Sequence, residues 1–214
     1  VLQKWALEQE NPLFWRNVQI AVILQGDRMV SLSEDDEDKM LTVGMEKIAG
    51  VAFIPLEDYN ACMGENRSLE PGQALLSTNR KGLDGRKELV IDGEQWEIVE
   101  ELPEIFAEKK VGDPMLNNYY VVVDSVETME RIAEERPTLG GLTYQKSYDL
   151  SGDPKVFEQA EDELSARAAE LASQSKQDYY VQVGARELNR RNFYQTYGGL
   201  FFLGIFLGLL FLMA

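Results

Sequence analysis

Short apolar runs separated by turn residues fill much of the chain, and each has about the length of a β-strand. The first is NVQIAVILQG (17–26), which ends where a glycine is followed by an aspartate. A second strand is predicted at Val51–Ile54. Pro55 ends it, and a short helix follows that ends at Gly64.

The clearest local pattern is a β-hairpin in the middle of the chain. Glu88–Ile91 and Gln95–Val99 are two strand-like runs on either side of Asp92-Gly93. Asp-Gly accepts the positive φ angles that a tight two-residue hairpin turn requires. Further upstream, Pro71-Gly72 predicts a turn that leads into another short strand.

Residues 118–186 alternate between strand and helix patterns. The runs NNYYVVVDS, LTYQKSYDL and DYYVQVGARE predict strands, and VETMERIAEER predicts a short amphipathic helix. Asp153 as a cap and Pro154 as a first helical residue predict a longer helix. This β-α-β-α-β order favours an open α+β sheet with helices on one face.

The last 18 residues, Tyr197–Ala214, contain no charged side chain and are nearly all large and apolar. As a helix they rise about 27 Å, slightly less than the roughly 30 Å hydrocarbon core of a bilayer. A buried soluble helix is the alternative, but such a helix normally keeps a polar stripe. We therefore predict a membrane-spanning helix that ends early. Gly204 and Gly208 have the spacing that allows two membrane helices to approach closely.

The segment before this helix shows no flexible linker. Residues 185–202 can form one continuous helix, in which Gly198-Gly199 is the soft point. A rigid helix of this kind could transmit movement from the membrane to the preceding domain, which a Gly/Ser tether could not do. Arg190 and Arg191 alone would place the domain in the cytoplasm, but the positive-inside rule loses its force for long domains.

Composition excludes several classes of function. The chain has 37 acidic and 21 basic residues and a formal net charge of −16, with no basic block of the kind that reads nucleic-acid phosphates. It has no histidine and one cysteine, so an internal disulfide and a Cys/His metal site are both excluded. Cys62 is expected to be a small buried hydrophobe, because no histidine can activate it.

Two acidic stretches invite a calcium interpretation, and both fit it poorly. Ser33 and the five acidic residues at 34–38 are more typical of a solvated helix start, and they lack the spacing of an EF-hand loop. Asp149, Ser151 and Asp153 alternate correctly, but proline and alanine stand where the loop needs glycine and glutamate. We predict no metal, no cofactor and no catalytic residue.

Several segments together resemble FtsX-like permeases of ABC transporters from Gram-positive bacteria, with the bacitracin-export type as the nearest branch. RRNFY followed by YGGLFFLGIFLGLLFLMA resembles the start of a late transmembrane helix in that family. YNACMGENRSLEPGQALL and YDLSGDPKVFEQAEDEL resemble parts of the large domain that precedes that helix. The resemblance covers most of Val51–Ala214.

The resemblance implies an extracellular domain that contacts antimicrobial peptides or lipids and moves with the membrane helices. It further implies a cytoplasmic ATPase subunit as partner, and in many cases a sensor kinase. The chain has no phosphate-binding loop of its own, so ATP hydrolysis would belong to that partner. The alternative is an adaptor or structural protein with an external soluble domain, anchored by a single helix.

These inferences combine into one expected organisation. We expect an α+β fold with mixed sheets, helices packed on one face and the start of a transmembrane helix at the end. Residues 1–17 are an unassigned flank, and the chain, which opens on Val1, is expected to be an excerpt of a longer protein. Residues 18–112 form the membrane-distal part and 113–189 the membrane-proximal part. Residues 190–214 form the juxtamembrane and truncated transmembrane helix.

Overall fold

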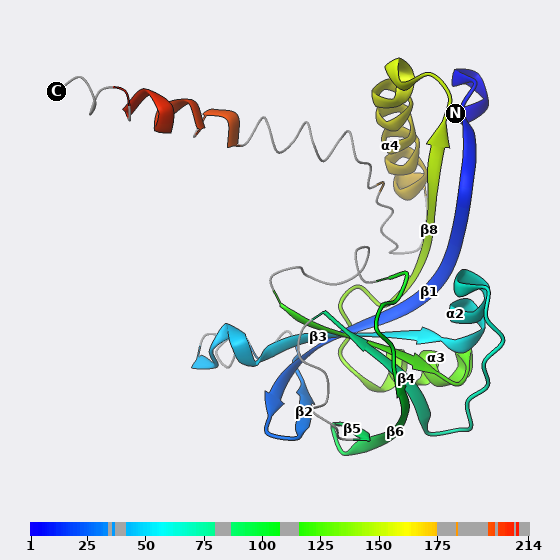
Figure 1. Ribbon diagram of the computed structural model, residues 1–214, viewed down its shortest axis with the longest axis vertical. Helices are drawn as coiled ribbons and strands as arrows, with labels where there is room; N and C mark the ends of the chain where they lie inside the picture. Colours follow the sequence, from blue (N-terminus) through cyan, green and yellow to red (C-terminus); the bar gives the residue numbers. More distant parts are fainter. Residues whose placement is uncertain are drawn as a thin grey trace. The chain divides into compact units, whose positions relative to one another are not determined.

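The computed structural model describes residues 1–33, 36, 42–79, 87–107, 116–174, 183, 197–199, 201–207 and 209. The strands are β1 (Glu8–Gln25), β2 (Arg28–Ser31), β3 (Ile48–Pro55), β4 (Gln73–Thr78), β5 (Glu88–Ile91), β6 (Glu94–Glu101), β7 (Asn117–Val123) and β8 (Leu142–Ser151). The α-helices are α2 (Leu56–Met63), α3 (Val126–Glu135) and α4 (Phe157–Gln174). Short 3-10 helices are η1 (Leu2–Trp5), η3 (Met45–Lys47) and η4 (Pro154–Val156) (Figure 1).

Most of the predicted elements are confirmed. The run at 17–26 lies in β1, the Pro55 break separates β3 from α2, and α2 ends at Gly64, which has a φ of 67°. The hairpin of β5 and β6 turns at Asp92-Gly93 with φ angles of 52° and 87°, as the tight turn requires. The predicted strand at 178–187 lies outside the described residues except for Val183.

The strands form one mixed sheet that closes on itself. Its order is β2-β5-β6-β4-β7-β3-β1-β8, and β2 also pairs with β1. The extra pairing joins the first strand of the order back to β1, so β1 to β7 form a ring. Within the ring β2–β5, β4–β6 and β3–β7 are parallel, and the other neighbours are antiparallel.

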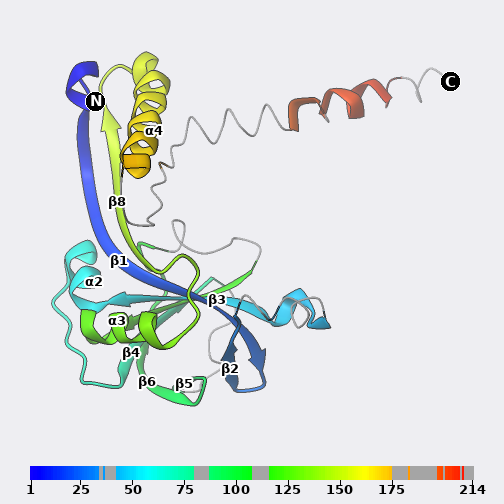
Figure 2. The same cartoon turned by 180° about the vertical axis from the view of Figure 1, so that it is seen from behind.

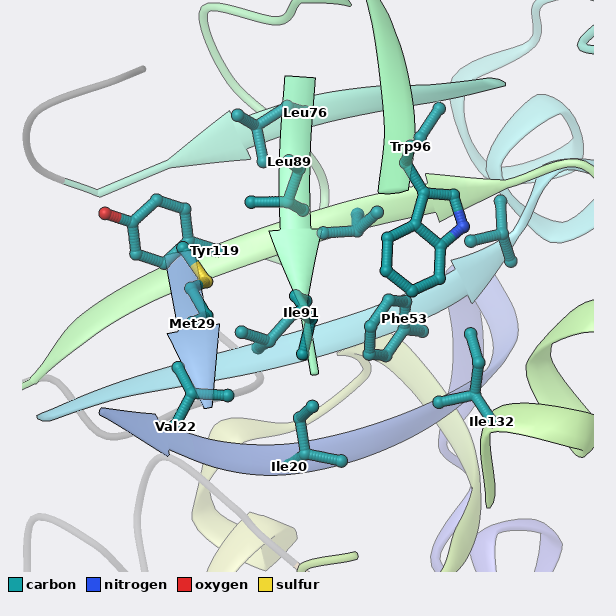
Figure 3. Packing of buried hydrophobic residues seen from close by; sticks show 14 of the residues in the cluster. Ile20, Val22, Met29, Phe53, Leu76, Leu89, Ile91, Trp96, Tyr119 and Ile132 are labelled. Atoms are coloured by element: carbon teal, nitrogen blue, oxygen red, sulfur yellow. The ribbon is translucent and has the colours of Figure 1, made fainter. Parts of the chain in front are cut away.

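Side chains from all seven strands of the ring fill its interior. They form one buried cluster, to which α3 adds Met129 and Ile132. Figure 3 shows Trp96, Phe53 and Ile20 among the interior side chains that point toward one another. A ring of this size is narrow enough for its own side chains to fill, so the closed sheet has a packed core.

The expectation that the helices cover one face of the sheet is wrong. α3 packs its apolar residues into the interior cluster, whereas α2 packs Leu56 and Tyr59 against a second cluster outside the ring. The reason lies in β3 and β7, in which nearly every residue is buried. In a strand alternate side chains point to opposite faces, so strands of this kind need cover on both sides.

The chain divides into two compact units, 13–147 and 1–12 with 148–214. The first contains the ring, α2 and α3. β7 of the predicted membrane-proximal part pairs there with β3 and β4 of the predicted membrane-distal part, so the two predicted parts share one sheet. The boundary predicted at residue 112 falls outside the described residues.

The second unit contains η1, the start of β1, the end of β8, η4 and α4. Glu163 of α4 accepts hydrogen bonds from Lys4 Nζ at 2.7 Å and from Trp5 Nε1 at 2.9 Å. Gly152 has a φ of 133°, and a Cβ there would lie 2.6 Å from Leu7 Cδ2. Only glycine fits at that position. Figure 2 shows α4, η1 and these ends of β1 and β8 from behind.

Candidate functional site

The C-terminal helical residues carry the most apolar exposed surface among the described residues. Residues 197–199 and 201–207 are helical, and the side chains of Phe201 and Phe202 are 65% and 70% exposed. The other large apolar side chains of this segment are also exposed: Tyr197, Leu203, Ile205, Phe206, Leu207 and Leu209. Consecutive helical residues point in successive directions around the axis, so this surface is apolar on all sides.

No helix among the described residues combines the length and the apolarity that crossing a membrane requires. The predicted span, Tyr197–Ala214, is described only at 197–199, 201–207 and 209. The transmembrane helix therefore stays a prediction.

Two groups of side chains stand out on these helical residues. Tyr197, Phe201, Gly204 and Ile205 line an apolar groove of about 380 Å³. A Cβ at Gly204 would meet nothing within 4 Å, so the groove is open at this position. Phe202 and Phe206 stack with their ring centroids 6.4 Å apart. A helix with a small residue in such a groove can receive a large side chain from another apolar helix.

A second notable group lies where α3 ends beside the β5–β6 hairpin. The side chain of Arg136 is 7% exposed, and its guanidinium lies 5.5 Å from the ring centroid of Trp96. Glu94 accepts hydrogen bonds from Arg136 Nη2 at 2.5 Å and from Arg131 Nη2 at 2.6 Å. Asp92 accepts from Arg136 Nε at 3.3 Å and from the Ser31 backbone N–H at 2.8 Å.

The electrostatics of this group favour a structural role. Burial raises the pKa of Glu94, but the hydrogen bonds from Arg131 and Arg136 outweigh burial and hold the pKa below its usual value. The hydrogen bond with Glu94 correspondingly raises the pKa of Arg131. Because carboxylates of the same group neutralise both guanidinium groups, the arrangement is poorly suited to bind an anion and instead joins α3 to the hairpin.

Another group of ion pairs joins β1 to the start of α2. Asp58 is buried and accepts hydrogen bonds from Arg16 Nη2 at 2.8 Å, Arg16 Nε at 2.9 Å and the Arg16 backbone N–H at 2.7 Å. Glu57 also pairs with Arg16. The hydrogen bond with Asp58 raises the pKa of Arg16. A two-pronged contact of this kind fixes both partners and leaves no arginine charge to receive a substrate.

Two exposed aromatic side chains lie together on β1 and β8. Phe14 and Tyr144 are 53% and 63% exposed, and their ring centroids are 6.4 Å apart. Cys62 Sγ donates to the Phe14 carbonyl at 3.4 Å, and Cys62 is half-buried. Exposed aromatic rings are frequent anchors in protein interfaces. Cys62 packs beside the outer cluster, as a small hydrophobe does.

The residues of the two calcium interpretations have other partners in the structure. Asp149 accepts from Asn11 Nδ2 at 3.1 Å, and Asp153 accepts from the Lys155 backbone N–H at 3.0 Å. Asp36 accepts from Ser33, and residues 34, 35, 37 and 38 lie outside the described part. The described residues contain no group of three or more His, Cys, Asp or Glu side chains that could hold a metal ion.

Reasoning from the sequence did not find the arginine groups or the aromatic pair. Arg136 and Glu94 are 42 residues apart, and so are Arg16 and Asp58. No local spacing signals such pairs, because each depends on which strands become neighbours. No protein-family model, no curated protein and no solved structure matches the chain.

Proposed function

We propose that this chain is the extracellular, substrate-sensing and motion-transmitting part of an ABC transporter permease of the FtsX-like type. The observation that carries the proposal is the exposed apolar surface of the C-terminal helical residues, led by Phe201 and Phe202. Water-soluble helices bury their apolar side chains, whereas hydrocarbon accepts them on every side of a helix. This surface supports attachment to the cell membrane through the C-terminal segment.

The unit at 13–147 supports the mechanical part of the proposal. Its ring of strands encloses a filled apolar core, and α3 packs into that core. Close-packed interiors have low compressibility and transmit strain. A domain of this kind would pass on a displacement instead of absorbing it. ATP hydrolysis would belong to a separate cytoplasmic ATPase subunit, and a sensor kinase is a further expected partner.

The charge of the chain supports a cationic ligand. A formal net charge of −16 attracts cationic peptides by long-range electrostatic steering, which raises the rate at which they associate with the chain. Lipid or a lipid-linked precursor is the second ligand class in the proposal.

The first test is retention of the full chain in membranes. We expect the wild-type chain to remain with membranes after alkaline carbonate extraction. Phe202→Lys combined with Phe206→Lys should release it, because each lysine costs roughly 2.5–3.5 kcal/mol at the centre of a membrane helix. Leu139→Lys is the matched control, since Leu139 is an exposed apolar residue of the other unit. Equal retention of all three chains would contradict attachment through this helix.

The second test is sidedness in intact cells. Cys62 is the one cysteine of the chain, so Cys62→Ser with Asp27→Cys places a single thiol in the exposed turn between β1 and β2. A membrane-impermeant maleimide should label it in intact cells if the domain is extracellular. Labelling only after permeabilisation would contradict the extracellular location.

The third test is a binding measurement, which distinguishes a ligand-sensing domain from an anchored domain that binds no ligand. Calorimetry of the full chain in detergent would use cationic antimicrobial peptides and lipid-linked cell-wall precursors as probes. We expect saturable binding of the peptides that weakens as salt is added, because salt screens the attraction between exposed charges. A folded chain that binds neither class would contradict the sensing function and favour an adaptor or structural protein.

A further inference from the structure

The β5–β6 hairpin presents one side of its strands to solvent. Leu89 and Trp96 point into the ring, as Figure 3 shows, so the residues that alternate with them point outward. These outward residues form the β5–β6 outer face: Glu88, Val90, Gln95, Glu97 and Val99. Val90 is half-buried and the other four are exposed. The two outer clusters of described residues include no residue of β5 or β6, so neither cluster covers this face.

Two carboxylates on this face oppose each other. Glu88 of β5 lies directly opposite Glu97 of β6, and opposed residues of paired strands point to the same side of the sheet. Gln73 Nε2 donates a hydrogen bond to Glu97 at 3.1 Å, which leaves the negative charge of both glutamates in place. Like charges in this arrangement destabilise a sheet. The pair therefore weakens the hairpin unless a cation from outside binds it.

Other carboxylates of β6 have basic partners, whereas this pair has none. Glu94 pairs with Arg136, and Glu100 pairs with Arg67. None of the ion pairs between described residues contains either member of the opposed pair. The basic side chain of Arg28 belongs to β2, opposite Val90. A ligand with basic groups would supply the charge that the fold itself does not bring to this pair.

A β-bulge adds an exposed apolar group to the same face. The pairing of β4 with β6 shifts in register between Ala74 and Leu75, and Val99 is the extra residue of β6. The side chain of Val99 is 46% exposed. Bulges frequently re-aim a side chain beside a functional site. The face thus offers carboxylates and an apolar group together, which complements a ligand that carries both basic and apolar groups.

A peptide fits this combination better than a metal ion does. The described residues contain no group of three or more His, Cys, Asp or Glu side chains that could hold a metal, and Val99 has no atom to offer one. A cationic peptide carries several basic side chains with apolar ones between them. It can therefore contact the carboxylate pair and the bulge at the same time.

We propose that the β5–β6 outer face is the docking surface for a cationic amphipathic peptide. Basic side chains of the peptide bind Glu88 and Glu97, and an apolar side chain packs on Val99. The inference rests on the proposed function for the class of ligand, and it names the surface that binds this ligand. Every residue of the face belongs to the unit 13–147, so the surface is complete within one compact unit.

The test measures binding of a dye-labelled peptide of alternating lysine and valine to the full chain in detergent. Fluorescence anisotropy reports the binding, and empty micelles are the blank. Glu88→Gln combined with Glu97→Gln removes both charges of the pair, and Val99→Ser removes the apolar group. Glu127→Gln combined with Glu130→Gln changes the net charge equally at exposed positions of α3 and is the matched control.

The docking surface predicts a separate result for each variant. The double variant at Glu88 and Glu97 should bind the peptide about three- to tenfold more weakly, since exposed ion pairs are individually weak. It should also unfold at higher urea concentration than the wild type, because it relieves the repulsion between the strands. Val99→Ser should weaken binding about threefold without changing its dependence on salt. The control should bind as the wild type does.

The outcomes separate this surface from the proposed function. Equal weakening in the two double variants would overturn the docking surface and leave the sensing function standing, because net charge alone would then explain the binding. A folded wild-type chain that does not bind the probe would overturn both. Weakening confined to the Glu88 and Glu97 variant, in a chain that membranes do not retain, would overturn membrane attachment and support the docking surface.

Discussion

Glu94 is the residue at which burial and charge oppose each other most directly. Its side chain is 29% exposed, and Arg131 and Arg136 both donate hydrogen bonds to it. Removing one member of such a group leaves the others with unbalanced charge, which costs more than the pair itself contributes. Arg136 is the most sensitive partner, because its guanidinium is nearly buried and lies over Trp96.

The lowered pKa of Glu94 gives a pH dependence with a definite sign. Because the folded chain holds this pKa below the ordinary value of 4.5, the unfolded chain binds more protons near that pH. The stabilisation is therefore present above pH 4.5 and is lost as the pH falls through the folded pKa. We expect Glu94→Gln to unfold at lower urea concentration than the wild type at neutral pH, with the difference shrinking in acid.

Urea unfolding at a series of pH values measures this difference. Glu130→Gln removes an exposed carboxylate from α3, the helix that carries Arg131, and is the matched control. It should follow the wild type at every pH. A gap between Glu94→Gln and the wild type that stays constant from neutral to acid pH would contradict the assigned ion pairs.

At the scale of elements, α3 acts as part of the core. Its N-cap Ser125 accepts a hydrogen bond from the Thr128 backbone N–H at 3.2 Å, and Met129 and Ile132 lie fully buried in the interior cluster. The amphipathic pattern of VETMERIAEER predicts this helix correctly. It does not reveal that the apolar stripe enters a closed ring of strands.

Shortening one core residue of α3 should show how tightly this element is held. We expect Ile132→Ala to lower the free energy of unfolding by about 2–5 kcal/mol, since Ile132 is 0% exposed and its removal leaves a cavity. Glu134→Ala, an exposed change on the same helix, should alter it little. Denaturant unfolding followed by tryptophan fluorescence measures both. A loss below 1 kcal/mol for Ile132→Ala would mean that α3 does not pack into the ring.

The hairpin shows why some elements are predictable and others are not. Asp92-Gly93 specifies β5 and β6 because the turn residues and both strands lie within a few positions of each other. The parallel pairing of β3 with β7 joins Ala49 to Asn117, and the β2–β1 pairing closes the ring. Many strand orders satisfy the same alternation of apolar residues, so neither pairing is readable from local pattern. The arginine groups depend on these pairings and were missed for the same reason.

At the scale of the whole molecule, charge is the dominant feature. The chain carries 37 acidic and 21 basic residues, and self-repulsion of this excess opposes the compact state. One acidic contact is built directly into the sheet, where Glu88 of β5 lies opposite Glu97 of β6. Like charges directly opposite each other on paired strands are destabilising.

Salt should therefore stabilise the fold. Raising the ionic strength from about 0.01 M to about 0.15 M shortens the screening length from about 30 Å to about 8 Å, so we expect the free energy of unfolding to rise. Glu88→Lys should be more stable than the wild type at low salt by roughly 0.2–1 kcal/mol and should gain less from added salt. Glu134→Lys changes the net charge equally at an exposed position of α3 and is the control. If Glu88→Lys stabilises the chain at low salt more than Glu134→Lys does, the effect belongs to the cross-strand pair. If both substitutions stabilise it equally, the effect belongs to net charge. A decrease in stability with salt would mean that the local ion pairs outweigh the repulsion.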